Sequence, residues 1–141
     1  MFDPHAPILI VDDCDEDFEI FGRTFAKAGV ANPLLRCANE RQWLEFLAAA
    51  GSPYPLLVVL DVNLPGVHGL DLLRMLRGHV RFGAVPVIVV STAADPRDVR
   101  DSYRLGGQGY LVKPVSMDRF ERMIEGLCRY WLETVILADP R

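Results

Sequence analysis

Short apolar runs and longer amphipathic stretches alternate along the whole chain. The apolar runs have the length of buried strands, and we predict strands over residues 7–11, 34–37, 56–60, 86–90 and 109–112. Between them, apolar residues recur at steps of three and four, as on one face of a helix. This spacing predicts helices over residues 15–29, 39–51, 68–77, 95–105 and 116–136. Asn39 and Ser116 are suitable N-terminal caps for two of these helices.

The alternation of strand and helix predicts an α/β fold. Parallel strands joined by helical crossovers form a sheet with helices on both faces, which is a doubly wound sheet. For five strands in 141 residues, the flavodoxin-like strand order 2-1-3-4-5 fits best. We expect a single domain over residues 1–141. Its core should span about residues 7–127, and an extended last helix and tail should occupy residues 128–141.

Polar side chains stand directly after four of the five predicted strands. They are Asp12 and Asp13 after the first strand, Asp61 after the third, Ser91 after the fourth and Lys113 after the fifth. In the 2-1-3-4-5 order these strand ends lie along one edge of the sheet, where such folds bind ligands. Asp61 alone could cap a helix or form a turn. With two more carboxylates nearby, the group needs a cation to offset the repulsion between like charges.

The oxygen ligands in this group suit a hard divalent cation, Mg²⁺ or Mn²⁺. We expect Asp12, Asp13, Asp61 and the backbone carbonyl of Asn63 to surround the ion. Such a site supports phosphoryl transfer to a carboxylate, with Asp61 as the nucleophile and Lys113 as a second cation. Catalysis of this kind depends mainly on positioning and electrostatics.

Composition and charge narrow the class of protein further. Half of the residues are hydrophobic, and the formal net charge of −4 argues against non-specific binding of nucleic acid. No apolar run approaches the roughly 20 residues that a membrane span requires, and the first residues do not resemble a signal peptide. The three cysteines include no C-x-x-C pair, which is typical of reduced thiols. We therefore expect a cytoplasmic protein with no membrane and no nucleic-acid partner.

Four segments of the chain resemble the receiver domain of two-component response regulators. They are residues 8–13 (ILIVDD), 60–66 (LDVNLPG), 86–91 (PVIVVS) and 109–114 (GYLVKP). Each segment alone is weak evidence. Four of them in this order, each at a predicted strand end, are specific, and the resemblance covers nearly the whole chain.

The resemblance implies a role for each residue at the strand ends. The implied roles are Asp61 as phosphoacceptor, Asp12 and Asp13 as the metal pair, Lys113 as the phosphate-binding lysine, Ser91 as the switch hydroxyl and Tyr110 as the aromatic switch. Ser91 would bond a phosphoryl oxygen only after transfer, and Tyr110 would then turn inward. Tyr110 could instead be an ordinary half-buried tyrosine. The peptide bond between Lys113 and Pro114 is expected to be cis.

Several neighbouring residues depart from the pattern of the receiver family. His68 stands where an acid is common. Because there is no second histidine or cysteine ligand nearby, we do not expect His68 to bind a metal ion. The acidic run 15–17 favours the first turn of a helix through the helix dipole, rather than binding the metal. Cys14 stands where a polar residue is frequent. The sequence does not decide whether this thiol makes the site sensitive to oxidation.

The predicted last helix is longer than a receiver domain needs. From residue 116 to 136 it would extend about 30 Å. Its apolar stripe consists of Phe120, Ile124, Leu127, Trp131 and Val135. An apolar patch that projects beyond the domain indicates a protein contact, so we expect a homodimer through the last two helices and the last strand. The alternative is a tail that folds back over its own domain.

The end of the chain, together with Asn63 in the central motif, resembles the stand-alone response regulators of bacterial and cyanobacterial phytochromes. The resemblance implies a phytochrome-type sensor histidine kinase as partner. We expect no output domain after Leu137, so that the signal passes through protein contacts. A phosphorelay intermediate or phosphate sink is an alternative. The sequence identifies neither the individual kinase nor the downstream target.

Two other classes of function remain as rivals of a phosphorylation switch. A phosphatase with an aspartyl nucleophile needs a second aspartate two residues later as general acid, and that position is Asn63. We therefore expect no enzyme activity beyond self-phosphorylation and autodephosphorylation. A constitutive adaptor that never needs phosphate would show no change in partner binding or dimerisation on phosphorylation.

Overall fold

The structure, a computed structural model, describes residues 3–137. Its strands are β1 (Ile8–Val11), β2 (Leu34–Cys37), β3 (Leu57–Asp61), β4 (Val87–Ser91) and β5 (Gly109–Val112). Its helical segments are α1 (Asp15–Lys27), α2 (Glu40–Ala48), α3 (Gly69–Arg77), α4 (Pro96–Arg104), α5 (Met117–Leu127) and the π-helical η1 (Cys128–Thr134). Residues 1–2 and 138–141 of the predicted domain lie outside the described residues.

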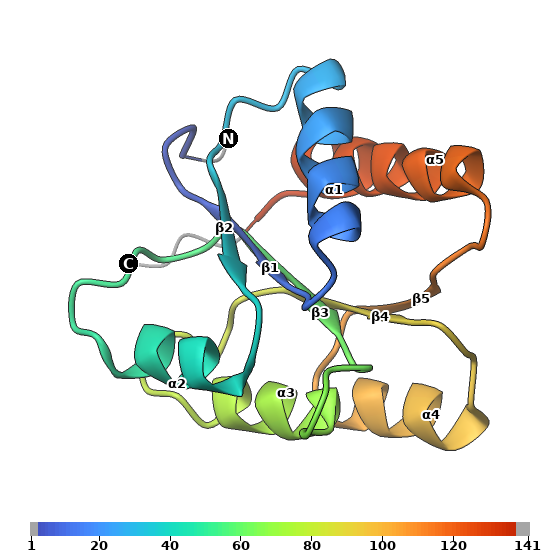
Figure 1. Cartoon of the computed structure of the whole chain (residues 1–141). Helices are drawn as coiled ribbons and strands as arrows, with labels where there is room; N and C mark the ends of the chain where they lie inside the picture. The colour runs from blue at the N-terminus through green and yellow to red at the C-terminus, as the bar shows by residue number, and fades with distance from the viewer. Residues whose placement is uncertain (1–2, 138–141) are drawn as a thin grey trace.

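The strands form one parallel sheet in the order β2-β1-β3-β4-β5, which confirms the predicted topology. Helices α1 and α5 lie on one face of the sheet, and α2, α3 and α4 lie on the other (Figure 1). Every residue of β1, β3 and β4 is buried, as expected for central strands that are covered on both sides. The site predicted from the strand ends therefore lies at one edge of a rigid sheet.

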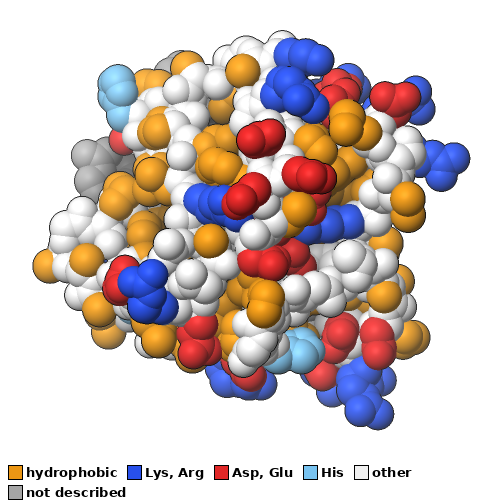
Figure 2. Space-filling view, in the orientation of Figure 1, with side chains coloured by type: hydrophobic (Ala, Val, Ile, Leu, Met, Phe, Trp, Pro, Cys, Tyr) orange, Lys and Arg blue, Asp and Glu red, His pale blue; other side chains and the backbone are white. Residues whose placement is uncertain are grey.

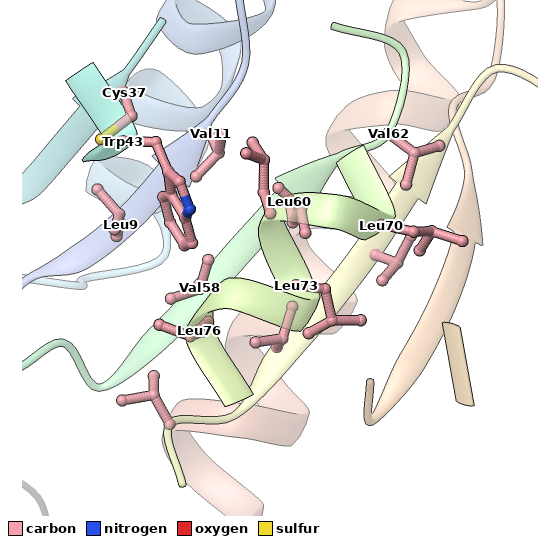
Figure 3. Packing of buried hydrophobic residues seen from close by; sticks show 14 of the residues in the cluster. Leu9, Val11, Cys37, Trp43, Val58, Leu60, Val62, Leu70, Leu73 and Leu76 are labelled. Carbon is pink, nitrogen blue, oxygen red and sulfur yellow. The ribbon is translucent and has the colours of Figure 1, made fainter. Parts of the chain in front are cut away.

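Alternate residues of the strands enter two separate hydrophobic clusters. On β1, Leu9 and Val11 pack in the cluster beneath α2 and α3, whereas Ile8 and Ile10 pack in the cluster beneath α1 and α5. Figure 3 shows the first cluster, in which the indole of Trp43 lies among strand side chains and Cys37. This alternation fixes the register of the strands, because a slip of one residue would exchange the two faces.

Helix α3 begins directly against the end of β3. A Cβ atom at Gly69 would lie 2.8 Å from the carbonyl oxygen of Asp61 and even closer to Cα of Val62, so only glycine fits there. His68 caps the helix, since its Nδ1 accepts a hydrogen bond from the amide of Leu70 at 3.2 Å. The start of α3 is thereby packed against the loop that follows Asp61.

The C-terminal helix differs from the prediction in two ways. It changes from α-helix to π-helix after Leu127 and ends at Thr134, where the amide of Val135 donates to the carbonyl of Tyr130, five residues earlier, at 2.7 Å. The apolar stripe does not remain exposed along its length. Phe120, Ile124 and Leu127 are buried in the core beneath α1 and α5.

The burial of Phe120, Ile124 and Leu127 corrects the dimer interface predicted from the sequence, because these three side chains cover the sheet of their own chain. Trp131 and Val135 are half-buried. The widened helix turns Leu132 inward, which leaves it 8 % exposed. The tail thus packs partly on its own domain, which was the alternative to a free projecting stripe.

The expected cis bond before Pro114 is wrong. All peptide bonds of the described residues are trans, the isomer that even X-Pro bonds favour by about 0.5–1 kcal/mol. Among residues 3–137, no helix combines the length and the apolar character needed to span a membrane.

Candidate functional site

Backbone hydrogen bonds at the ends of the strands position the charged side chains of the site. The amide of Asp12 follows β1 and donates to the carbonyl of Cys37 on β2 at 3.1 Å. The amide of Lys113 follows β5 and donates to the carbonyl of Ser91 on β4 at 2.7 Å. Asp61 is the last residue of β3, between these two pairs. The extension of the sheet ladder therefore carries three functional residues to one edge.

The ammonium of Lys113 lies at the centre of a cluster of carboxylates. Its Nζ is 2.8 Å from Oδ2 of Asp12, 2.8 Å from Oδ2 of Asp17 and 2.9 Å from Oδ2 of Asp61. The lysine side chain is only 10 % exposed, and those of Asp12 and Asp61 are 2 % and 5 % exposed. The three hydrogens of an ammonium can serve one carboxylate each, so the group is a satisfied, charge-assisted network.

Burial and this network shift the pKa values of the central pair. Burial raises the pKa of Asp12 above its ordinary value, and the hydrogen bond from Lys113 opposes the rise only in part. Burial alone would lower the pKa of Lys113, but its hydrogen bonds to the three carboxylates outweigh that effect and raise the pKa. Lys113 therefore remains charged throughout the physiological range, which a phosphate-binding group requires.

Three carboxylates at this edge have the arrangement of a metal site. Oxygens of Asp12, Asp13 and Asp61 lie within 4.8 Å of one another, and Asp13 is exposed whereas the other two are buried. The second oxygens are fixed locally: Oδ1 of Asp12 accepts from the amide of Cys14 at 2.9 Å, and Oδ1 of Asp61 accepts from the amide of Asn63 at 2.8 Å. Oxygen ligands open to solvent on one side fit Mg²⁺ or Mn²⁺, which keep several waters.

A second group of residues beside the carboxylates is uncharged. The hydroxyl of Ser91 donates to Oδ1 of Asn63 at 3.1 Å, and the same oxygen accepts from the amide and the hydroxyl of Thr92 at 2.9 and 3.2 Å. The amide of Ala93 donates to the Ser91 hydroxyl at 3.2 Å, and the hydroxyl of Tyr110 donates to the carbonyl of Ala93 at 2.9 Å. The peptide groups around Ala93 therefore connect the predicted switch hydroxyl to the predicted aromatic switch.

The side chains of Cys14, Asp15 and His68 make no hydrogen bond to Lys113 among the described residues, whereas that of a further acidic residue does. Asp15 pairs with Arg36 at 2.7 Å, and Cys14 stands at the start of α1. His68 lies outside the carboxylate triad and is 3.5 Å from Asp98 on α4. The further acidic residue is Asp17, which sequence reasoning assigned to the helix alone. Its place in the first turn of a helix that begins directly after Asp12 and Asp13 was the available signal.

Figure 2 shows this edge of the molecule as a surface. Acidic side chains gather near the centre of the view with Lys or Arg side chains beside them. The geometry combines a cluster of carboxylates that could hold a divalent cation with a buried ammonium, and such an arrangement is chemically suited to phosphoryl transfer.

The apolar groove nearest the predicted dimer surface lies beside β5. It has a volume of about 280 Å³, and its lining includes Leu111, Met123, Leu127, Tyr130 and Trp131. Tyr130 is 56 % exposed and packs edge-to-face on Trp131, with ring centroids 5.4 Å apart. These two aromatic residues therefore form part of the wall of the groove beside β5.

Fold and site together are those of a receiver domain of signalling proteins. The response regulator receiver domain family matches residues 8–125, and the chain belongs to this family. It is similar to response regulator Rcp1 of Synechocystis sp., with 30% identity over 138 residues that cover 95% of this chain and 94% of Rcp1.

Solved structures support the same relationship. The crystal structure of the Mn²⁺-bound form of Rcp1 has a TM-score of 0.88 at 29% identity, covering 95% of this chain and 99% of that one. The response regulator RPA3017 in red light signaling of R. palustris has a TM-score of 0.81 at 28% identity, with the same coverage. The bacteriophytochrome response regulator RtBRR has a TM-score of 0.70 at 29% identity, covering 97% of this chain and 84% of that one. The chain is thus a receiver-domain response regulator similar to those associated with phytochromes, as the sequence predicted.

Proposed function

We propose that this protein is a single-domain response regulator that accepts a phosphoryl group on Asp61 from a sensor histidine kinase. The observation that carries the proposal is the ammonium of Lys113, held 2.9 Å from Asp61 beside the triad of Asp12, Asp13 and Asp61. An ordinary structural ion pair would need one carboxylate, not four. The additional carboxylates are explained if they bind a divalent cation and if Asp61 accepts a phosphoryl group.

The chain's own residues supply most of the chemistry of transfer. An oxygen of Asp61 attacks phosphorus, the O–P bond forms, and the imidazole of the donor phosphohistidine leaves with the electrons of the broken P–N bond. Lys113 donates to a phosphoryl oxygen and offsets its charge. Asp12, Asp13, Asp61 and the carbonyl of Asn63 would hold Mg²⁺, which supplies further neutralisation of phosphoryl charge when bound.

The switch follows from an exchange of hydrogen-bond partners. Ser91 now donates to Asn63 at 3.1 Å. After transfer a charged phosphoryl oxygen is the better acceptor, so Ser91 leaves Asn63 and disturbs its contact with Ala93. The carbonyl of Ala93 holds the hydroxyl of Tyr110, so Tyr110 is released to turn inward. The changed surface is then read by a protein partner.

Similarity to the bacteriophytochrome response regulator RtBRR, and to RPA3017 in red light signaling, supports a phytochrome-type kinase as the phosphodonor. A phosphorelay intermediate or phosphate sink uses the same site and stays an alternative. A phosphatase is not favoured, because Asn63 cannot serve as a general acid and its side-chain oxygen is engaged with Ser91 and Thr92. Any hydrolysis is therefore expected to be limited to the protein's own acyl phosphate.

The test uses acetyl phosphate and Mg²⁺ with the intact chain. Wild type should acquire an acid-stable, base-labile phosphoryl group, seen as a mass increase of one phosphoryl per chain. Asp61→Asn should acquire none, whereas Asp71→Asn, which alters an exposed carboxylate on α3, should behave as wild type. Labelling that persists in Asp61→Asn would refute the assignment of the phosphoacceptor.

We further propose that the protein forms a homodimer through the last two helices and β5, with Trp131 and Tyr130 at its centre rather than the buried Phe120, Ile124 and Leu127. The apolar groove beside β5 supports this. In sedimentation, Trp131→Glu should be monomeric. Leu44→Glu, which alters an apolar side chain that is 45 % exposed on α2, outside the proposed interface, is the control for a non-specific effect of the new charge. A dimer that survives in Trp131→Glu would contradict this placement.

A further inference from the structure

Asp17 differs from the other two carboxylates that bind Lys113. Asp12 and Asp61 belong to the triad that could hold a metal ion, whereas Asp17 does not. Its Oδ2 nevertheless lies 2.8 Å from Nζ of Lys113, as close as that of Asp12. The motif chemistry of the receiver site gives this third contact no role.

The other two partners of Lys113 change during the proposed reaction. Asp61 becomes an acyl phosphate, so the hydrogen that points to it must turn to a phosphoryl oxygen. Asp12 comes under the influence of the divalent cation, which competes for its lone pairs. Asp17 has no such second partner, so it is the contact that can persist unchanged from the free to the phosphorylated state.

Asp17 is also fixed to a rigid part of the molecule. It is the third residue of α1, and α1 is anchored to α5 by an edge-to-face contact between Phe21 and Phe120, whose ring centroids are 5.5 Å apart. Its side chain is 22 % exposed, less than the 85 % of Asp15 on the same turn. A carboxylate on a well-packed helix can hold a flexible lysine more accurately than one on a loop.

We propose that Asp17 is a positioning residue, whose carboxylate anchors the ammonium of Lys113 at the mouth of the site and keeps it aimed at the phosphoryl group on Asp61. Asp17 touches neither the reacting atoms nor the metal site, and it acts through Lys113. The inference rests on the proposed function for its catalytic consequence, but not for the anchoring itself.

The kinetic test separates anchoring from charge. Asp17→Asn should lower the rate of phosphorylation by acetyl phosphate and Mg²⁺ about tenfold, the usual effect of losing a group that orients a functional side chain. Glu16→Gln removes the same charge from the same helical turn, without a contact to Lys113 among the described residues, and should change the rate less than about twofold. Equal rates in wild type and Asp17→Asn would overturn the inference.

A double-mutant cycle tests whether Asp17 acts through Lys113. In a Lys113→Ala background, Asp17→Asn should cause no further loss of rate. A loss as large as in wild type would show that Asp17 acts through the helix or the net charge, and would overturn the inference. Asp17→Glu, which keeps the carboxylate, should recover part of the rate.

A second measurement does not depend on phosphorylation or on a stable Lys113→Ala variant. Lysine occurs only at positions 27 and 113, so selective ¹³C labelling of lysine gives two side-chain signals, and exposed Lys27 is an internal reference. In metal-free wild type the Lys113 side chain should be far more ordered than Lys27, and in Asp17→Asn this difference should shrink. Unchanged order of Lys113 would refute the anchor even if Asp61 is phosphorylated. A reduced order with no labelling of wild type would refute only the proposed function.

Discussion

The two halves of the site are held together by different forces. The charged half, around Lys113, is buried and joins side chains that are up to 101 residues apart in the chain. The neutral half, around Asn63 and Ser91, consists of ordinary hydrogen bonds, several of them exposed. Charge-assisted bonds are roughly twice as strong as neutral ones. The difference in strength is what the proposed function requires: a firmly held charged group beside contacts weak enough to be exchanged when a phosphoryl group binds.

Removing the ammonium of Lys113 should have the largest effect on stability. Lys113→Ala leaves buried carboxylates without a partner, which should lower the free energy of unfolding by about 3 kcal/mol in metal-free solution. Saturating Mg²⁺ should recover much of this loss, because it binds the folded state and replaces the missing charge. Urea denaturation with EDTA or with Mg²⁺ measures both quantities.

The matched control for this variant is Lys27→Ala on the exposed end of α1, which should stay within about 0.5 kcal/mol of wild type. If both lysine variants lower the free energy of unfolding equally, the buried contacts of Lys113 stabilise the fold no more than an exposed lysine does. The proposed difference between the charged and the neutral half would then be wrong.

The raised pKa of Asp12 predicts an intermediate effect that depends on pH. Between its ordinary value of 3.8 and the raised pKa, the folded state binds a proton more tightly than the unfolded state. Metal-free stability should therefore fall as pH rises through this window, by at most about 1.4 kcal/mol per pH unit. Asp12→Asn lacks this titration, so its stability relative to wild type should grow with pH and then level off above the window. A difference that is constant from pH 3.5 to 7 in denaturation experiments would contradict the burial of a charged Asp12.

Breaking the neutral half should have the smallest effect. Asn63→Ala removes the acceptor shared by Ser91 and Thr92 and should cost about 1 kcal/mol, because these bonds are replaced by water. The backbone carbonyl at position 63 remains, so the affinity for Mn²⁺, measured by titration, should stay within about threefold of wild type. A tenfold loss of Mn²⁺ affinity would show that the two halves are not separable.

The sequence was sufficient to predict the sheet order and the charged half of the site, because the ends of parallel strands must meet at one edge. Asp61 and Lys113 are separated by 52 positions, yet their place at strand ends brings them together. Side chains on helices were harder to place. The direction of the Asp17 side chain depends on the orientation of α1 about its own axis. Because α1 begins with acids at three successive positions, the sequence pattern does not specify which of them faces the site.

The C-terminal end was predicted least well for a related reason. The stripe through Trp131 assumed 3.6 residues per turn, whereas the π-helical segment from Cys128 to Thr134 has hydrogen bonds to the fifth residue. The wider turn shifts the phase of every following side chain. It buries Leu132 and leaves Trp131 at the edge of the groove beside β5. No local pattern in the sequence specifies that change of helix type.

The two tryptophans of the chain lie on opposite faces of the sheet. Trp43 is fully buried among β1, β3 and α3, and its indole nitrogen has no hydrogen-bond partner within residues 3–137, while Trp131 is half-buried beside β5. The molecule therefore contains two intrinsic fluorophores in contrasting environments. Emission from Trp43 should be blue-shifted and shielded from iodide, whereas Trp131 should respond to quencher and to any protein that covers it. A single tryptophan-to-phenylalanine replacement turns the chain into an optical sensor of either its core or its outer surface.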